Sequence, residues 1–199
     1  MVPGVVAWRE LEPISKQIVA APAAILSQAM TREEFVARYG GIYEHSAWVA
    51  ERAFPNVGGG MRVDDIESAL AACVDAADRD TKLALIRAHP DLAGKAAVRG
   101  ELTGDSTHEQ KSAGIDQCSA REFESFQALN ARYKAKFGFP FVMAVRDRNR
   151  QEILRAFAAR LENDSATEFD TAIREIHEIA RLRLRAIHSH ERHEETDGR

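Results

Sequence analysis

Apolar side chains recur every three or four residues over almost the whole of this chain. That spacing places them on one face of an α-helix, whereas a half-buried strand alternates with a period of two. No long segment of the sequence shows such alternation. The pattern predicts an all-α fold, a single compact domain of about seven to nine helices.

Length, charge and cysteine content narrow the class of protein. With 199 residues the chain can bury a core as one domain. Its net charge of −4 offers no electrostatic argument for nucleic acid or membrane as a partner. Cys73 and Cys118 lack the spacing of a zinc site or a disulfide framework, and neither a signal peptide nor a spanning apolar run is found. We expect a cytoplasmic protein that binds neither nucleic acid nor membrane.

Capping residues and prolines set the expected helix boundaries. Thr31 with Glu34, and Ser106 with Glu109, have the spacing of a capping box. Pro90 ends a helix just before it, because the residue preceding proline disfavours helical geometry. The expected helices cover about residues 13–29, a short stretch from 31, 44–54, from 64 or 65 to 77, from 80 or 81 to 88, 91–100, 106–136, 147–161 and 166–188. The folded domain is expected at 11–188, with flexible termini at 1–10 and 189–199.

Three polar side chains, Ser106, Glu109 and Gln110, lie close together at one of these helix starts. The free N–H groups of a helix N-terminus can also bind an anion or a polar ring. These residues could therefore serve only as a helix cap, or they could line a binding site. The local spacing does not distinguish the two interpretations.

Arg183 is out of place in the last expected helix. At 100° per residue it falls on the same arc as Ile176 and Ile179, which face the core. Burying a guanidinium costs several kcal/mol unless a carboxylate or a ligand meets it. Arg183 should therefore form an internal ion pair or face an anionic ligand in a cavity.

His89 lies between the end of one helix and Pro90, which restricts its backbone to extended geometry. An imidazole at such a rigid junction suits a positioned acid or base. The alternative is a histidine that only satisfies free carbonyl groups at the helix end.

The segment "KFGFPFVMAV", residues 136–145, is too apolar for a surface loop. A buried extended segment leaves backbone N–H and C=O groups in need of partners, which a polar ligand could supply. The alternative is a hydrophobic plug between two helices.

Two other patterns carry little functional weight. His188, His190 and His193 lie in a polar tail and do not match the H-E-x-x-H spacing of a metal site. The arginines of residues 181–185 point in different directions on a helix, which argues against a nucleic-acid surface. We therefore expect no functional metal site.

Several motifs in order carry a family resemblance: "GGIYEHSAWVAERAF", "AHPDLAGKAA", "ELTGDSTHEQKSAG", "FQALNARYKAKFGFPFVMAVR" and "EIARLRLRAI". Together they resemble the 2-oxo-4-hydroxy-4-carboxy-5-ureidoimidazoline (OHCU) decarboxylases of uric acid degradation. The resemblance spans residues 11 to 188 and implies an all-α homodimer that uses no metal or organic cofactor. The implied reaction converts OHCU to (S)-allantoin and carbon dioxide, with functional coupling to 5-hydroxyisourate hydrolase and urate oxidase.

The resemblance also implies roles for individual residues. His89 and Glu109 are the expected catalytic residues. The expected substrate-binding residues are Pro90, Ser106, Gln110, Phe141, Val142, Met143, Ala144, Val145 and Arg183. We expect His89 to exchange a proton with the substrate and Glu109 to orient His89 by a hydrogen bond, rather than to cap its own helix. Arg183 would hold the anionic substrate.

Two other functions compete with this one. The first is a noncatalytic helical binding module that retains the fold, in which the polar residues are only caps and core pairs. The second is a metal hydrolase that uses the tail histidines; it should lose activity with a chelator or after truncation of the tail.

Overall fold

The computed structural model describes residues 30–57, 62–94 and 100–197. These residues form eight α-helices and two short 3-10 helices, and no strand occurs among them, so the predicted all-α fold is confirmed. The helix expected at 13–29 and residues 95–99 of the one expected at 91–100 lie outside the described residues. No helix in the described ranges is long and apolar enough to cross a membrane.

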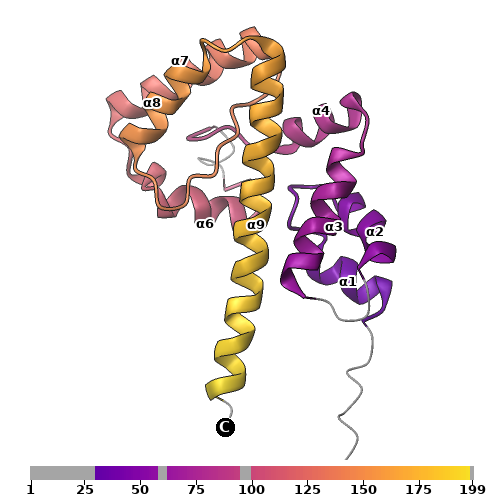
Figure 1. The fold of residues 1–199 in the computed structure, drawn as a ribbon. Helices are drawn as coiled ribbons and strands as arrows, with labels where there is room; N and C mark the ends of the chain where they lie inside the picture. The colour runs from indigo at the N-terminus through magenta and orange to yellow at the C-terminus, as the bar shows by residue number, and fades with distance from the viewer. Residues whose placement is uncertain (1–29, 58–61, 95–99, 198–199) are drawn as a thin grey trace, which may run out of the picture.

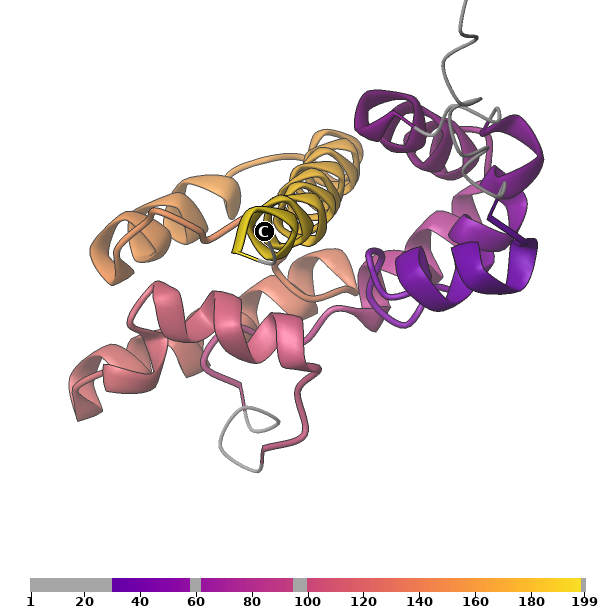
Figure 2. The same cartoon turned by 90° about the horizontal axis from the view of Figure 1, so that it is seen from below.

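The helices are arranged around α9, which runs through the middle of the molecule (Figure 1). Helices α1 to α4 lie on one side of α9, and α6 to α8 lie on the other, as the view from below also shows (Figure 2). The elements are α1 (Arg32–Tyr39), α2 (Trp48–Ala53), η1 (Phe54–Asn56), α3 (Val63–Asp75), α4 (Arg79–Ala88), α6 (Gly104–Ser112), η2 (Ile115–Gln117), α7 (Ala120–Phe137), α8 (Arg150–Arg160) and α9 (Ser165–Asp197).

The segment after α7 is buried by aromatic packing. The Phe141 ring stacks on Phe157 of α8 with centroids 3.8 Å apart, and Tyr133 of α7 meets both rings edge-on. All three side chains are almost fully buried. Aromatic contacts of this kind add to the free energy of area burial, so they hold residues 139–145 as an extended strap between α7 and α8.

The capping-box spacing occurs at two expected helix starts, but a capping box forms at only one of them. The capping box of Thr31 and Glu34 is present at the start of α1, as predicted. The helix start expected at Ser106 is wrong, because the N-cap of α6 is Thr103, whose hydroxyl accepts the backbone N–H of Ser106 at 3.3 Å, and Ser106 and Glu109 form no capping box. Ser106 and Glu109 therefore lie inside the helix, and both side chains are free for other contacts.

The single helix predicted for 106–136 is also wrong. Helix α6 ends at Ser112, and Gly114 then adopts φ of +69°, a left-handed conformation that glycine accepts without strain. A capping box of Ser119 and Glu122 starts α7. Asp78 rather than Asp80 or Thr81 caps α4, and Arg62 rather than an aspartate precedes α3.

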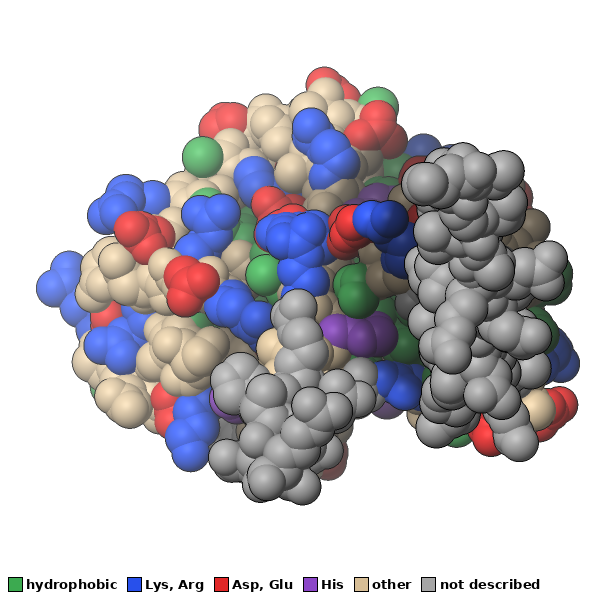
Figure 3. All heavy atoms as spheres, turned by 60° about the horizontal axis from the view of Figure 1, so that its bottom comes forward, with side chains coloured by type: hydrophobic (Ala, Val, Ile, Leu, Met, Phe, Trp, Pro, Cys, Tyr) green, Lys and Arg blue, Asp and Glu red, His purple; other side chains and the backbone are tan. Residues whose placement is uncertain are grey.

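Helix α9 continues past His188 to Asp197 and extends beyond the other helices in Figure 1. Its backbone is therefore helical through most of the tail that was expected to fray. On the face shown in Figure 3, Lys and Arg side chains lie intermingled with Asp and Glu side chains. This mixture fits the small net charge of the chain.

Candidate active site

His89 lies where the sequence predicted, directly after α4, with extended backbone geometry at φ of −77° and ψ of 139°. Its Nδ1 lies 3.0 Å from the carbonyl oxygen of Leu85. Because a carbonyl can only accept, Nδ1 carries the proton and Nε2 of the neutral ring has a free lone pair. Nε2 is buried and has no hydrogen-bond partner among the described residues.

Burial lowers the pKa of His89 from its ordinary 6.5 to about 4. The hydrogen bond to Leu85 and the nearby carboxylate of Glu44 oppose this shift, whereas the charge of Arg183 adds to it. The imidazole is consequently neutral at physiological pH and presents a proton acceptor.

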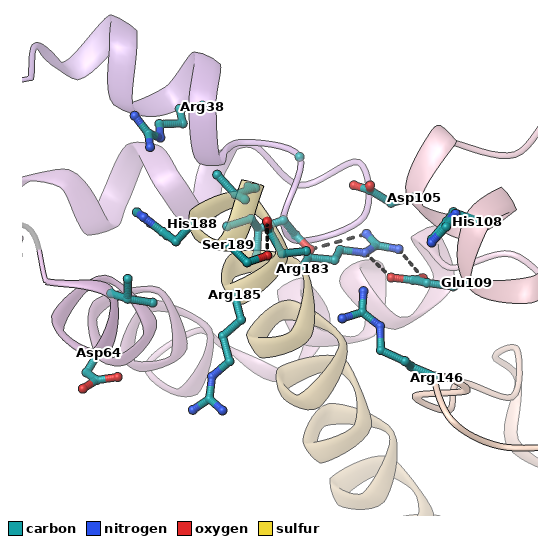
Figure 4. Close-up of a pocket in the computed structure, with 15 residues that line it drawn as sticks. Arg38, Asp64, Asp105, His108, Glu109, Arg146, Arg183, Arg185, His188 and Ser189 are labelled. Carbon is teal, nitrogen blue, oxygen red and sulfur yellow. Dashed lines mark hydrogen bonds and ion pairs between the residues drawn. The ribbon is translucent and has the colours of Figure 1, made fainter. Parts of the chain in front are cut away.

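Arg183 lies on the core face of α9 and is 5 % exposed. Its Nη1 donates to Glu44 at 2.7 Å. Its Nε and Nη2 donate to the two carboxylate oxygens of Glu109 at 2.7 and 2.8 Å (Figure 4). Nη2 also donates to the hydroxyl of Ser106 at 3.3 Å. The predicted internal ion pair is therefore present, with one guanidinium shared between two carboxylates.

The charges of this cluster stabilise one another. Burial alone would lower the pKa of Arg183, but its contacts with Glu109 and Glu44 outweigh burial and raise it. Burial would raise the pKa of Glu44, but the hydrogen bond from Thr103 and the charge of Arg183 lower it. Arg183 and Glu44 therefore form a charged pair beside the neutral imidazole of His89.

Glu44 was not predicted as a site residue. It lies in the irregular segment between α1 and α2, and its side chain is 1 % exposed. The only sequence signal was an acidic residue enclosed by Ile42, Tyr43 and the helix-forming stretch after it. The helix expected at 44–54 begins only at Trp48, so helical periodicity counted from residue 44 did not indicate which way the Glu44 side chain points.

The expected hydrogen bond between Glu109 and His89 is not present. Both carboxylate oxygens of Glu109 are bound by Arg183. Glu109 also does not fold back on the backbone N–H of Ser106, which is bound by Thr103. The guanidinium fork prevails over both because two parallel charge-assisted hydrogen bonds are stronger than one to an imidazole or an amide.

Side chains from α8, from α9 and from the segment just before α8 bind the backbone of the 139–145 strap. Nη1 of Arg160 donates to the carbonyl of Val142 at 2.7 Å, and a carboxylate oxygen of Glu175 accepts the N–H of Ala144 at 2.8 Å. The carbonyl of Ala144 accepts from Nε of Arg148 at 3.2 Å. Neither the N–H nor the C=O of Met143 has a hydrogen-bond partner among the described residues.

Gln110 fixes the loop that follows His89. Its Oε1 accepts the N–H of Ala93 at 3.1 Å, and its side chain is buried. Pro90 and Leu92 lie next to this contact and border the same cavity. Gln110 thus has a structural contact as well as a position at the site.

These elements line a small cavity of about 30 Å³, which has room for about one or two water molecules. Every predicted site residue lines it except Ala144; the lining is His89, Pro90, Leu92, Ser106, Glu109, Gln110, Phe141, Val142, Met143, Val145, Ile179 and Arg183. On the outer side of the Glu109–Arg183 pair lies an open groove of about 930 Å³, which Arg146 and His108 also border (Figure 4). The ion pair separates the cavity from the groove.

Metal ligands are not clustered in the described part of the chain. No three His, Cys, Asp or Glu side chains there are arranged to hold an ion. His188 contacts Tyr39 at 3.1 Å, and the side chains of His190 and His193 lie outside the described residues.

A profile of the family described as OHCU decarboxylase matches residues 28–185, more than half of the chain. The chain belongs to the OHCU decarboxylase family. It is 47 % identical over 152 residues to the 2-oxo-4-hydroxy-4-carboxy-5-ureidoimidazoline decarboxylase of Haloferax volcanii, covering 76 % of this chain and 88 % of that protein. The family segment thus includes every residue of the site described above.

Two further similar proteins are longer than the segment that matches this chain. The chain is 41 % identical over 152 residues to the uric acid degradation bifunctional protein PucL of Bacillus subtilis, covering 74 % of this chain and 29 % of that protein. A solved structure of (S)-allantoin synthase has a TM-score of 0.64 and 31 % identity, covering 81 % of this chain and 51 % of the other. In both cases the OHCU decarboxylase domain is part of a longer protein.

Proposed function

We propose that this protein is a cofactor-independent OHCU decarboxylase that produces (S)-allantoin and carbon dioxide, the last step from urate to allantoin. The observation that carries the proposal is the small cavity that neutral His89 and Arg183 both line, where Nε2 of His89 has no hydrogen-bond partner among the described residues. Membership of the family supports the same reaction, since the Haloferax volcanii relative has this name.

Arg183 is the group that recognises the substrate carboxylate. A guanidinium presents two parallel N–H donors that match a carboxylate, and Nε with Nη2 of Arg183 already binds one carboxylate in this way. Met143 offers a free backbone N–H and C=O for the ring or ureido amides. These contacts would hold the scissile carbon–carbon bond perpendicular to the plane of the unsaturated ring.

The protein has only to position the substrate and move protons. When the carbon–carbon bond to the carboxylate breaks, carbon dioxide leaves and the electron pair moves into the adjacent ring C=N. The hydroxyl on the same carbon then loses its proton as a carbonyl forms, and a proton is added to the ring carbon that bears the ureido group. One proton from solvent is consumed overall, because a monoanion becomes neutral allantoin.

His89 is the proposed group for these proton transfers. Its Nε2 accepts the hydroxyl proton and can return it to the neighbouring ring carbon, which bears the ureido group, a step that contributes about 10²–10⁴-fold to the rate. Glu109 takes part in the proton transfers only after the substrate carboxylate has replaced it on Arg183. Delivery of the proton by His89 to one face of the ring accounts for a single stereoisomer of allantoin.

The experiment is a coupled assay that follows circular dichroism. Urate, urate oxidase and 5-hydroxyisourate hydrolase generate OHCU, whose spontaneous decay gives racemic allantoin with no signal. Addition of this protein should produce a rapid signal of the S enantiomer, and a His108→Asn variant, altered at the groove but not at the cavity, should behave like wild type. A racemic product at the spontaneous rate would favour the noncatalytic binding module.

The oligomeric state, location and coupling of the enzyme are further parts of the proposal. We expect a cytoplasmic homodimer, because the family resemblance implies one, and light scattering of the full chain would measure its mass. The bifunctional relative in Bacillus subtilis supports coupling to the preceding reactions of urate breakdown. A faster coupled rate when the three enzymes are mixed than with pre-formed OHCU would test that coupling.

A further inference from the structure

Glu44 is the most deeply buried carboxylate of the cluster and lines neither the cavity nor the groove. One of its oxygens accepts the hydroxyl proton of Thr103 at 2.7 Å, and the other accepts Nη1 of Arg183 at 2.7 Å. The Thr103 hydroxyl is also the N-cap of α6. Glu44 therefore joins the start of α6 to the guanidinium on α9.

The two carboxylates on Arg183 are not equivalent. Glu109 borders both the cavity and the groove, and its side chain is 15 % exposed. Glu44 is 1 % exposed and has both oxygens bound by separate elements. A ligand arriving in the cavity meets Glu109, which lines it, whereas Glu44 lies outside the cavity lining.

The positions of the guanidinium nitrogens agree with this division. Glu109 takes Nε and Nη2, the edge that forms a fork with a carboxylate, while Glu44 takes only Nη1. A substrate carboxylate that displaces Glu109 would meet the complete fork. It would leave the contact with Glu44 unbroken.

We propose that Glu44 is a positioning residue that holds Nη1 of Arg183 while Glu109 leaves the other edge of the guanidinium and the substrate carboxylate takes its place. The released Glu109 is then free to turn toward His89. In this structure no hydrogen bond joins the two residues, because Arg183 still binds both carboxylate oxygens of Glu109. The inference rests on the proposed decarboxylase function.

Other charged groups face Glu44 and must be considered. Arg183 reaches Glu44 from α9, and Thr103 reaches it from the start of α6. His89, at the end of α4, interacts electrostatically with the Glu44 carboxylate. His45, next in the chain, lies 4.0 Å away and is mostly exposed. Glu44 could therefore act through its charge on these groups instead of through its hold on Arg183, and the test must separate the two.

The test compares Glu44→Met, which removes the acceptor, with Glu44→Gln, which removes the charge but keeps an acceptor oxygen. We expect Glu44→Met to lower kcat/KM for OHCU by at least about tenfold, the value of one charge-assisted hydrogen bond, and Glu44→Gln to lower it clearly less. The Kd of (S)-allantoin, which has lost the carboxylate, should change less than about threefold in both. Glu122→Gln, at an ion pair remote from the cavity, is the matched control.

The other outcomes overturn the inference. Equal losses in the Met and Gln variants would assign the effect to charge, and an equal loss of allantoin affinity would assign it to collapse of the site. If Glu44→Met and Glu44→Gln both had activity near that of wild type, Glu44 would not be needed to position Arg183. Inactive wild-type protein would instead refute the proposed function. If Glu44→Met does not fold, Thr103→Val and Thr103→Ser are compared in its place. We then expect kcat/KM for OHCU to fall in Thr103→Val, which lacks the hydroxyl, but not in Thr103→Ser.

Discussion

At the scale of single residues, the sequence identified Arg183 and His89 but not Glu44. Arg183 stands out because helix periodicity places its Cα on a buried arc, and His89 because Pro90 restricts its backbone. Both signals are local. Glu44 lies in a segment without periodic structure, and its burial depends on α6 and α9, which lie far along the chain.

The histidine at the cavity should be essential for turnover. His89→Asn keeps a side-chain donor for the carbonyl of Leu85 but removes the proton acceptor at Nε2. We expect the rate of (S)-allantoin formation to fall about 10²–10⁴-fold with the helical circular dichroism spectrum unchanged. An active His89→Asn enzyme would exclude His89 as the acid/base.

The buried histidine should also make the protein sensitive to acid. Its pKa is about 4 in the folded protein and 6.5 in the unfolded chain, so the unfolded state takes up a proton first as pH falls. Stability present above pH 6.5 is lost between about pH 6.5 and 4, by up to about 3 kcal/mol. Urea unfolding at several pH values should show a smaller loss for His89→Asn; equal losses would contradict the low pKa.

Removing the guanidinium should affect the fold as well as the reaction. Arg183→Met leaves Glu44 buried without its cation, although Thr103 still donates to it. We expect the free energy of unfolding to drop by about 3–5 kcal/mol, together with a loss of OHCU turnover. The double variant Glu44→Gln, Arg183→Met should recover part of the stability but not the turnover, as measured by urea unfolding and the coupled assay.

At the scale of secondary structure, helix existence was predictable and several boundaries were not. Thr103 and Ser106 are three residues apart, and each begins a plausible N-cap pattern in "TGDSTHE". Glu109 completes a capping box only with Ser106, which favoured the wrong start. The actual choice is made by tertiary contacts, because Arg183 binds Glu109 and Ser106 while Glu44 binds Thr103.

This assignment of the cap can be checked directly. Thr103→Ala removes the N-cap hydroxyl of α6 and the donor to buried Glu44, and should reduce the free energy of unfolding by about 1–2 kcal/mol. Ser106→Ala removes only a 3.3 Å hydrogen bond from Arg183 and should cost less than about 1 kcal/mol. The reverse order in thermal or urea unfolding would show that Ser106 caps the helix.

At the scale of the whole molecule, the site is assembled by α9 from parts that lie far apart in the chain. Helix α9 brings Arg183 to α6 and to the segment before α2, and its Glu175 binds the strap that follows α7. Periodicity predicted each helix but carries no information on which helices pack together. The predicted site residues came together on the basis of the family resemblance, which already contains that information.

The end of α9 should contribute little to this assembly. Truncation after Ser189 keeps the buried residues of α9 up to Leu184 and the contact of His188 with Tyr39. We expect the melting temperature and OHCU turnover to stay close to those of the full chain, and added chelator to have no effect on either protein. Loss of activity on truncation or chelation would support the tail-histidine metal hydrolase instead.

The carboxylate of Glu109 on Arg183 makes the empty enzyme its own competitor. An intramolecular competitor is present at an effective concentration that free acids in a cell do not reach. Acetate, lactate and similar ions therefore cannot displace it through their charge alone. A ligand succeeds only if its ring also gains contacts with the strap and with His89, so the ion pair that blocks the empty site also selects what enters it.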